Sequence, residues 1–87
     1  MLVLELTLYS RSGCHLCEEM KAVVEAVSAD YPLRLREVDI DTDPELRSRY
    51  DTEVPVLLIN DRKAFKYRVS PRDLRARLQR EATHSSK

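Results

Sequence analysis

The chain has few side chains that bind metals. Its 87 residues include only two cysteines and two histidines. A four-cysteine zinc site is therefore excluded, and His84 is the only histidine that does not lie between the cysteines. We expect no metal site built within one chain, whereas a metal or iron–sulfur cluster shared between two chains stays open.

The chain also lacks a long hydrophobic run. The apolar start, Met1 to Leu8, is interrupted by Glu5 and is too short to cross a bilayer. It has neither the basic residues nor the small-residue cleavage site of a signal peptide. We therefore expect a soluble, cytoplasmic protein with no membrane partner.

The chain has no net charge, but its acidic and basic residues are unevenly distributed. The 15 basic and 15 acidic residues cancel. Up to Ile59 there are twelve acidic residues against six basic ones, and from Asn60 onward nine basic residues against three acidic ones. A basic third of this kind can meet an acidic partner, but a solvated surface is the simpler explanation. Nucleic acid is not an expected partner.

The length and composition fit one small globular domain. Apolar residues make up 43% of the chain and charged residues 34%, which is not the profile of a disordered protein. A domain of this size builds one modest core. We expect a single domain over residues 1–82, a flexible tail over residues 83–87, and a monomer.

Apolar periodicity predicts seven elements. They are a strand over 3–9, a helix over 14–29, a strand over 33–40, a helix over 43–50, strands over 54–59 and 63–68, and a helix over 70–82. The crossover rule makes the first two strands parallel, and a short turn makes the last two an antiparallel hairpin. The continuous apolar run of the third strand indicates cover on both faces.

Two local patterns add detail to this order. Ser70, Pro71 and Asp73 form the start of the last helix, with Ser70 as the N-cap. Asp43 and Pro44 open the short helix in the same way. Within the strand over 33–40, the apolar positions change parity midway, which either a bulge or cover on both faces near its end would explain.

The most reactive segment is Cys14-His15-Leu16-Cys17, where the first strand gives way to a helix. A thiol at a helix N-terminus lies in the positive field of the helix dipole, so its thiolate is favoured. A second thiol one turn later can attack a mixed disulfide formed by the first. In a reducing compartment such a pair is redox-active or metal-binding more often than structural.

This element order, with the two cysteines after the first strand and Val54-Pro55 opening the third, resembles the thioredoxin fold in its small glutaredoxin form. The segment from Tyr9 to Cys17 is similar to that of small bacterial glutaredoxin-like proteins. The resemblance implies an α/β, thioredoxin-like fold. In this fold the elements follow the order β-α-β-α-β-β-α along the chain, and the four strands form a mixed sheet with helices on both faces.

The resemblance also implies a glutaredoxin-like thiol–disulfide oxidoreductase that reduces or exchanges disulfides of proteins or small molecules. Cys14 takes the role of nucleophile and Cys17 that of resolving thiol. The resemblance implies a cis Val54–Pro55 bond against the cysteine loop, although most X–Pro bonds are trans. No bound cofactor is expected, and the reductant would be glutathione or a flavin reductase.

Five residues are predicted to bind substrate: Arg11, His15, Val54, Pro55 and Asp73. Arg11 stands where glutaredoxins resemble one another in having a lysine, and would stabilise the thiolate or a substrate carboxylate; a loop arginine facing water is the alternative. A protonated His15 would favour the Cys14 thiolate, whereas a neutral, solvent-facing His15 would not.

The chain departs from the known patterns at three places. Glutaredoxins usually have Cys-Pro-Tyr-Cys, and their Gly-Gly with an acidic pair before the last helix is replaced here by Val69 to Asp73, in which only Asp73 is acidic. The Trp-Cys-Gly-Pro-Cys of thioredoxins and their buried aspartate, where Leu8 stands, are absent. These departures argue against glutathione. They leave open a second function, a non-catalytic module that docks a partner or shares a cluster.

Overall fold

The computed structural model describes residues 3–85, and the side chains of residues 3–81. The elements in chain order are β1 (Leu4–Ser10), α1 (His15–Val27), β2 (Leu33–Asp39), the 3-10 helix η1 (Ile40–Thr42), α2 (Pro44–Tyr50), β3 (Val56–Ile59), β4 (Arg62–Lys66) and α3 (Pro71–Ser85). The predicted order is confirmed, with η1 as an addition. Residues 83–85 of the expected tail continue α3, and residues 86–87 lie outside the described part.

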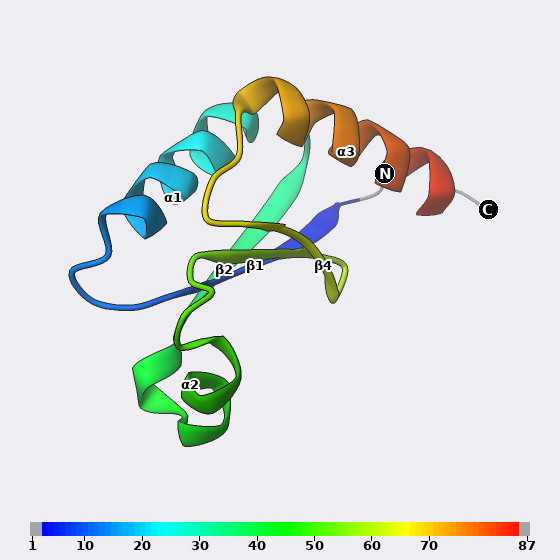
Figure 1. The fold of residues 1–87 in the computed structure, drawn as a ribbon. Helices are drawn as coiled ribbons and strands as arrows, with labels where there is room; N and C mark the ends of the chain where they lie inside the picture. Colours follow the sequence, from blue (N-terminus) through cyan, green and yellow to red (C-terminus); the bar gives the residue numbers. More distant parts are fainter. Residues whose placement is uncertain (1–2, 86–87) are drawn as a thin grey trace.

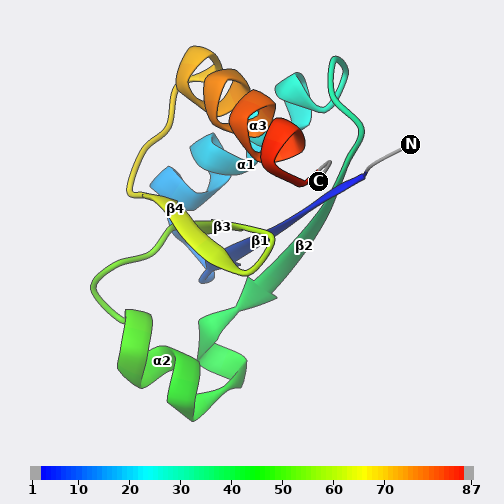
Figure 2. The ribbon, with the colours of Figure 1, turned by 90° about the vertical axis from the view of Figure 1, so that its right-hand side faces the viewer.

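The four strands form one mixed sheet in the order β2-β1-β3-β4. β1 and β2 are parallel, from Leu4 opposite Leu33 to Ser10 opposite Asp39. β3 is antiparallel to both β1 and β4. Helices α1 and α3 lie on one side of the sheet and α2 on the other (Figures 1 and 2). No helix within residues 3–85 is long and apolar enough to cross a membrane.

Each face of the sheet covers its own apolar cluster. The large cluster, between the sheet and helices α1 and α3, consists of Leu4, Leu6, Leu8, Met20, Val24, Val27, Leu57, Ile59, Leu74 and Leu78. The small cluster, on the α2 side, consists of Ile40, Tyr50, Val56 and Leu58. Successive residues of β3 thus enter different clusters, because side chains alternate across a strand. This explains the continuous apolar run of β3.

The change of parity in β2 comes from cover on both faces. Its pairing with β1 has no register shift, which excludes a bulge. Leu33 and Leu35 pack against the large cluster, whereas Ile40, just after the strand, belongs to the small one. A register shift does occur in the β3–β4 hairpin, between Leu57 and Leu58 of β3.

The two predicted helix starts are present. The Asp43 side chain accepts a hydrogen bond from the Glu45 N–H at 2.9 Å, and Pro44 is the first residue of α2. The Ser70 Oγ accepts one from the Asp73 N–H at 3.1 Å. Each such cap contributes about 1 kcal/mol to stability.

Candidate functional site

The loop before the cysteines is a tight turn. The Cys14 N–H donates to the carbonyl of Arg11 at 3.3 Å, and Gly13 has a φ of +73°. Only glycine adopts such an angle at no steric cost. A Cβ at this position would meet nothing within 4 Å, so the backbone angle and not lack of space selects the single glycine of the chain.

Cys14 is the N-cap of α1, and it is joined to Cys17 by a disulfide. The Cys17 N–H donates to the Cys14 Sγ at 3.1 Å, so the sulfur takes the place of the usual capping oxygen. Cys14 is half-buried, whereas Cys17 is only 3% exposed. Cys14 is therefore the more accessible of the two cysteines.

Pro55 lies at the same end of the sheet as the cysteine loop. Because β3 is antiparallel to β1, Val56 pairs with Tyr9, and Pro55 comes directly before Val56. The Val54–Pro55 bond is cis in this structure. Pro55 is buried, and its carbonyl accepts a hydrogen bond from the Tyr67 N–H at 2.9 Å.

The neighbouring Val54 is half-buried. Its N–H donates to the Tyr50 carbonyl at 3.3 Å, so this amide already has a partner. The binding of substrate by Val54 and Pro55 stays a prediction.

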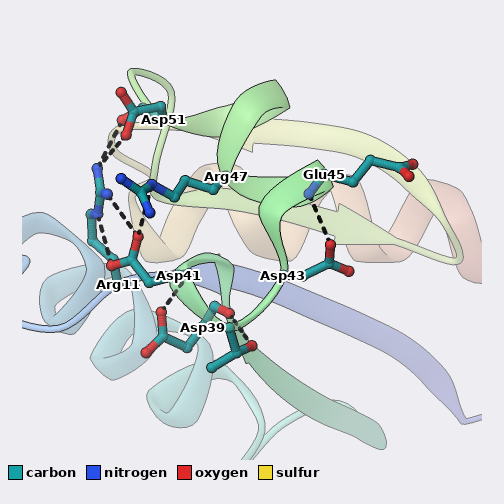
Figure 3. Close-up of polar contacts among 8 residues, drawn as sticks. Arg11, Asp39, Asp41, Asp43, Glu45, Arg47 and Asp51 are labelled. Atoms are coloured by element: carbon teal, nitrogen blue, oxygen red, sulfur yellow. Dashed lines mark hydrogen bonds and ion pairs between the residues drawn. The ribbon is translucent and has the colours of Figure 1, made fainter.

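Arg11 contacts two carboxylates on the α2 side of the sheet (Figure 3). Its Nη2 lies 2.8 Å from the Asp41 Oδ1 and its Nε 3.4 Å from the Asp41 Oδ2. Its Nη1 donates to the Asp51 Oδ1 at 2.9 Å and to the Asp51 carbonyl at 3.2 Å. Arg11 thus neither faces water freely nor has an uncompensated charge.

These contacts shift two pKa values. The hydrogen bond from Arg11 is the main cause that lowers the pKa of Asp41, and the positive charges of Arg11 and Arg47 add to it. Hydrogen bonds to Asp41 and Asp51 raise the pKa of Arg11. The predicted role of Arg11 toward substrate is left untested by these contacts.

His15 projects into solvent between the cysteines. Its side chain is 86% exposed, and its Nε2 lies 3.0 Å from the Glu19 Oε2, one helical turn further along α1. In this structure the imidazole therefore contacts a carboxylate. Its predicted influence on Cys14 remains a prediction.

A groove of about 370 Å³ opens between α1 and the segment that joins β4 to α3. It is lined by Leu16, Glu19, Met20, Val23, Tyr67, Arg68, Val69, Ser70 and Asp73. The structure thus brings the predicted Asp73 to the same groove as Leu16, which lies between the two cysteines. Arg11 lines a different, polar hollow together with Ser10, Ser12, Glu37 and Asp39.

One residue of this groove has an unusual backbone. Tyr67 has a φ of +69°, which is rare for a tyrosine. Its hydroxyl donates to the Thr52 carbonyl at 3.1 Å. Through its N–H and its hydroxyl, Tyr67 therefore holds the chain on both sides of Val54. It connects the groove to the start of β3.

Sequence reasoning did not find the partners of these residues. Asp41 and Asp51 lie 30 and 40 positions from Arg11, and the acidic excess before Ile59 was the only signal for them. Nothing in the sequence pointed to Tyr67.

Within the described residues, no group of three or more His, Cys, Asp or Glu side chains is placed to hold a metal ion. The His84 side chain lies outside the described ones.

A second set of polar contacts joins α1 and the end of β1 to Glu37 of β2. The Lys21 Nζ lies 3.1 Å from one oxygen of Glu37, and the buried Ser10 donates its hydroxyl to the other at 3.2 Å. The hydrogen bond to Glu37 raises the pKa of Lys21. The end of β1, where the cysteine loop begins, is thereby fixed to its neighbour.

Residues 5–79 match the model of the glutaredoxin-like domain family (DUF836). Over 67 residues the chain is 31% identical to the "glutaredoxin-like protein YDR286C homolog" of Dictyostelium discoideum. The aligned part covers 70% of this chain and 62% of that protein. The chain therefore spans less than two thirds of this curated relative.

Two examples illustrate the similarity to solved structures. The crystal structure of target protein XcR50 from X. campestris is 34% identical, with a TM-score of 0.73, over 85% of this chain and 95% of that one. Oxidised mitochondrial thioredoxin 3 from Saccharomyces cerevisiae is 16% identical, with a TM-score of 0.65, over 87% and 76% of the two chains. The second likeness shows the thioredoxin-like fold alone.

Proposed function

The chain belongs to the glutaredoxin-like domain family, and on this basis we propose that it is a thiol–disulfide oxidoreductase. The observation that carries the proposal is the pair at the start of α1, with Cys14 half-buried and Cys17 buried within bridging distance. The Cys17 N–H, aimed at the Cys14 sulfur, and the helix dipole both favour a thiolate at Cys14.

The reaction proceeds in two exchanges. The Cys14 thiolate attacks one sulfur of the substrate disulfide, forms a mixed disulfide and releases the other sulfur as a thiolate, which takes up a proton. Cys17, deprotonated, then attacks the Cys14 sulfur. The Cys14–Cys17 bridge forms, the second substrate thiol leaves, and two electrons have passed to the substrate. Two equivalents of a thiol such as glutathione, or a flavin reductase, return the bridge to the dithiol.

The groove beside Leu16 is the proposed place for the substrate group next to the disulfide. Its far wall is the start of α3, where the Ser70 side chain already holds the Asp73 N–H and Pro71 has no N–H to offer. Few amides of this helix end are therefore available to a substrate carboxylate. This supports a protein disulfide as substrate more than glutathione.

Two serine variants test the proposal, with reduction of a mixed-disulfide peptide as the assay. We expect Cys14→Ser to lower the rate by at least about 100-fold, because the nucleophile is lost. We expect Cys17→Ser to accumulate the mixed disulfide on Cys14, detectable by mass spectrometry. Ser12→Ala, in the same turn, is the control and should keep its activity.

Unchanged reduction by Cys14→Ser would refute the proposal. Stoichiometric iron in anaerobically purified wild-type protein, without turnover, would instead favour the cluster-sharing module.

A further inference from the structure

Arg11 connects the two loops that form the site. Its carbonyl accepts the N–H of Cys14 and so closes the turn that leads into α1. Its guanidinium reaches Asp51, whose carboxylate and backbone carbonyl both accept hydrogen bonds from Nη1. Asp51 lies three residues before Val54. One residue therefore holds the cysteine turn and the segment that approaches Pro55.

The guanidinium is also bound at its other edge. Asp41, in η1, accepts from Nη2 and Nε, which is the two-point geometry that suits a carboxylate. Among the ion pairs of residues 3–81, only Arg11 contacts two carboxylates at 3.0 Å or less. Its side chain is 28% exposed, whereas that of Arg34, paired with Glu5 at 3.7 Å, is 71% exposed.

We propose that Arg11 is a positioning residue, which holds the Arg11–Cys14 turn against Asp41 and Asp51 so that Cys14 stays in place to bond with Cys17. This inference rests on the proposed function of the pair. An ordered turn raises the effective concentration of one thiol at the other, and so favours the bridge over the dithiol. The charge of Arg11, balanced by two carboxylates, is not what acts on the Cys14 sulfur.

A positioning role and a charge role of Arg11 predict different results when Arg11 is replaced and when its two carboxylate partners are replaced. Arg11→Gln takes away a positive charge, whereas the double variant D41N/D51N takes away two negative ones. If Arg11 acted by its charge on the thiolate, the two variants would shift the pKa of the Cys14 thiol in opposite directions. If it acts by position, both variants loosen the same turn.

The test is equilibration of each protein in glutathione redox buffers, with the bridged fraction measured by alkylation and mass spectrometry. We expect the equilibrium constant for bridge formation to fall about 3- to 10-fold in both variants. Arg11→Lys, which keeps the positive charge but loses the planar two-point fork of the guanidinium, should fall between wild type and Arg11→Gln. Arg34→Gln, which breaks the exposed ion pair between Arg34 of β2 and Glu5 of β1, is the matched control and should leave the equilibrium constant unchanged.

Three outcomes would overturn the proposal: no change in either variant, a change in only one, or Cys14 pKa shifts of opposite sign in alkylation–pH profiles. Circular dichroism confirms that each variant is folded, and the single variants D41N and D51N replace the double variant if it is not. The equilibrium can be measured for any dithiol. Failure of this inference is therefore distinguishable from failure of the proposed reductase activity, which the peptide assay measures on wild-type protein.

Discussion

The two faces of the sheet are held by different forces. On the α1–α3 face, ten buried apolar residues form the large cluster among the described residues. On the α2 face there are four, and Arg11 contacts the carboxylates of Asp41 and Asp51 on the same face. Burial of apolar surface is the larger source of free energy, and charged contacts fix geometry more than they stabilise. We infer that one face supplies most of the stability and the other the placement of the site.

The lengths of the helices account for much of this difference. Helix α2 has seven residues, against thirteen in α1 and fifteen in α3, so it has fewer apolar positions to offer. Its contribution centres on Tyr50, whose ring stacks on Tyr9 with centroids 4.9 Å apart. The Lys63 Nζ lies 5.6 Å from the Tyr50 centroid. Aromatic and cationic contacts thus add to the aliphatic packing on the α2 face.

We expect the largest loss of stability from a deletion in the large cluster. Leu74 of α3 is fully buried against it. We expect Leu74→Ala to lower the free energy of unfolding by about 2–5 kcal/mol, because apolar contacts are lost and a cavity is left. Urea denaturation measures this. A loss below about 1 kcal/mol would mean that this face does not dominate stability.

The small cluster should respond more weakly to a smaller deletion. Ile40 is fully buried on the α2 face. We expect Ile40→Val to cost about 0.5–1.5 kcal/mol in the same urea experiment, since one methylene is removed. It should also leave the bridge equilibrium in glutathione buffer unchanged, because the Ile40 side chain packs within the small cluster. A cost as large as that of Leu74→Ala would remove the distinction between the faces.

The smallest expected effect concerns pH. The pKa of Asp41 is lower in the folded protein, chiefly through Arg11. Its contribution to stability is therefore present above the unfolded value, about 4, and is lost as the pH falls through the lower folded value. Wild type should be more stable than Asp41→Asn at pH 6, and the difference in melting temperature should shrink by pH 3.

Glu5→Gln provides the control for this titration, because the pair of Glu5 with Arg34 is long and exposed. Its melting temperature should follow that of wild type at both pH values. If Asp41→Asn does so too, the carboxylate does not stabilise this face.

Most of the fold could be predicted because its signals are local. The cap of α3 depends on Ser70 and Asp73, three residues apart, and the hairpin on the short turn after Ile59. The position of Pro55 near the cysteines was implied by the resemblance, whereas the antiparallel pairing of β3 with β1 was found only in the structure. Helix α3 continues to Ser85, beyond the predicted end at residue 82, because no glycine or proline after Glu81 stops it.

The contacts within the site could not be predicted in the same way. The pairing of Arg11 with Asp51 spans 40 positions, and which of the many acids between residues 39 and 53 it meets depends on the tertiary fold. The left-handed backbone of Tyr67 has no signal in its own residue type, since tyrosine rarely adopts it. Long-range pairing and local strain are set by the whole chain.

The capping of α1 by a cysteine has a consequence for experiment. The Cys17 amide hydrogen points at the Cys14 sulfur, so its electronic surroundings change whenever that sulfur gains or loses a covalent partner. An isotope-labelled sample would display this as a displaced resonance of the Cys17 amide. The protein thereby contains its own reporter, with which each covalent state of Cys14 can be followed without an added dye or label on the thiols.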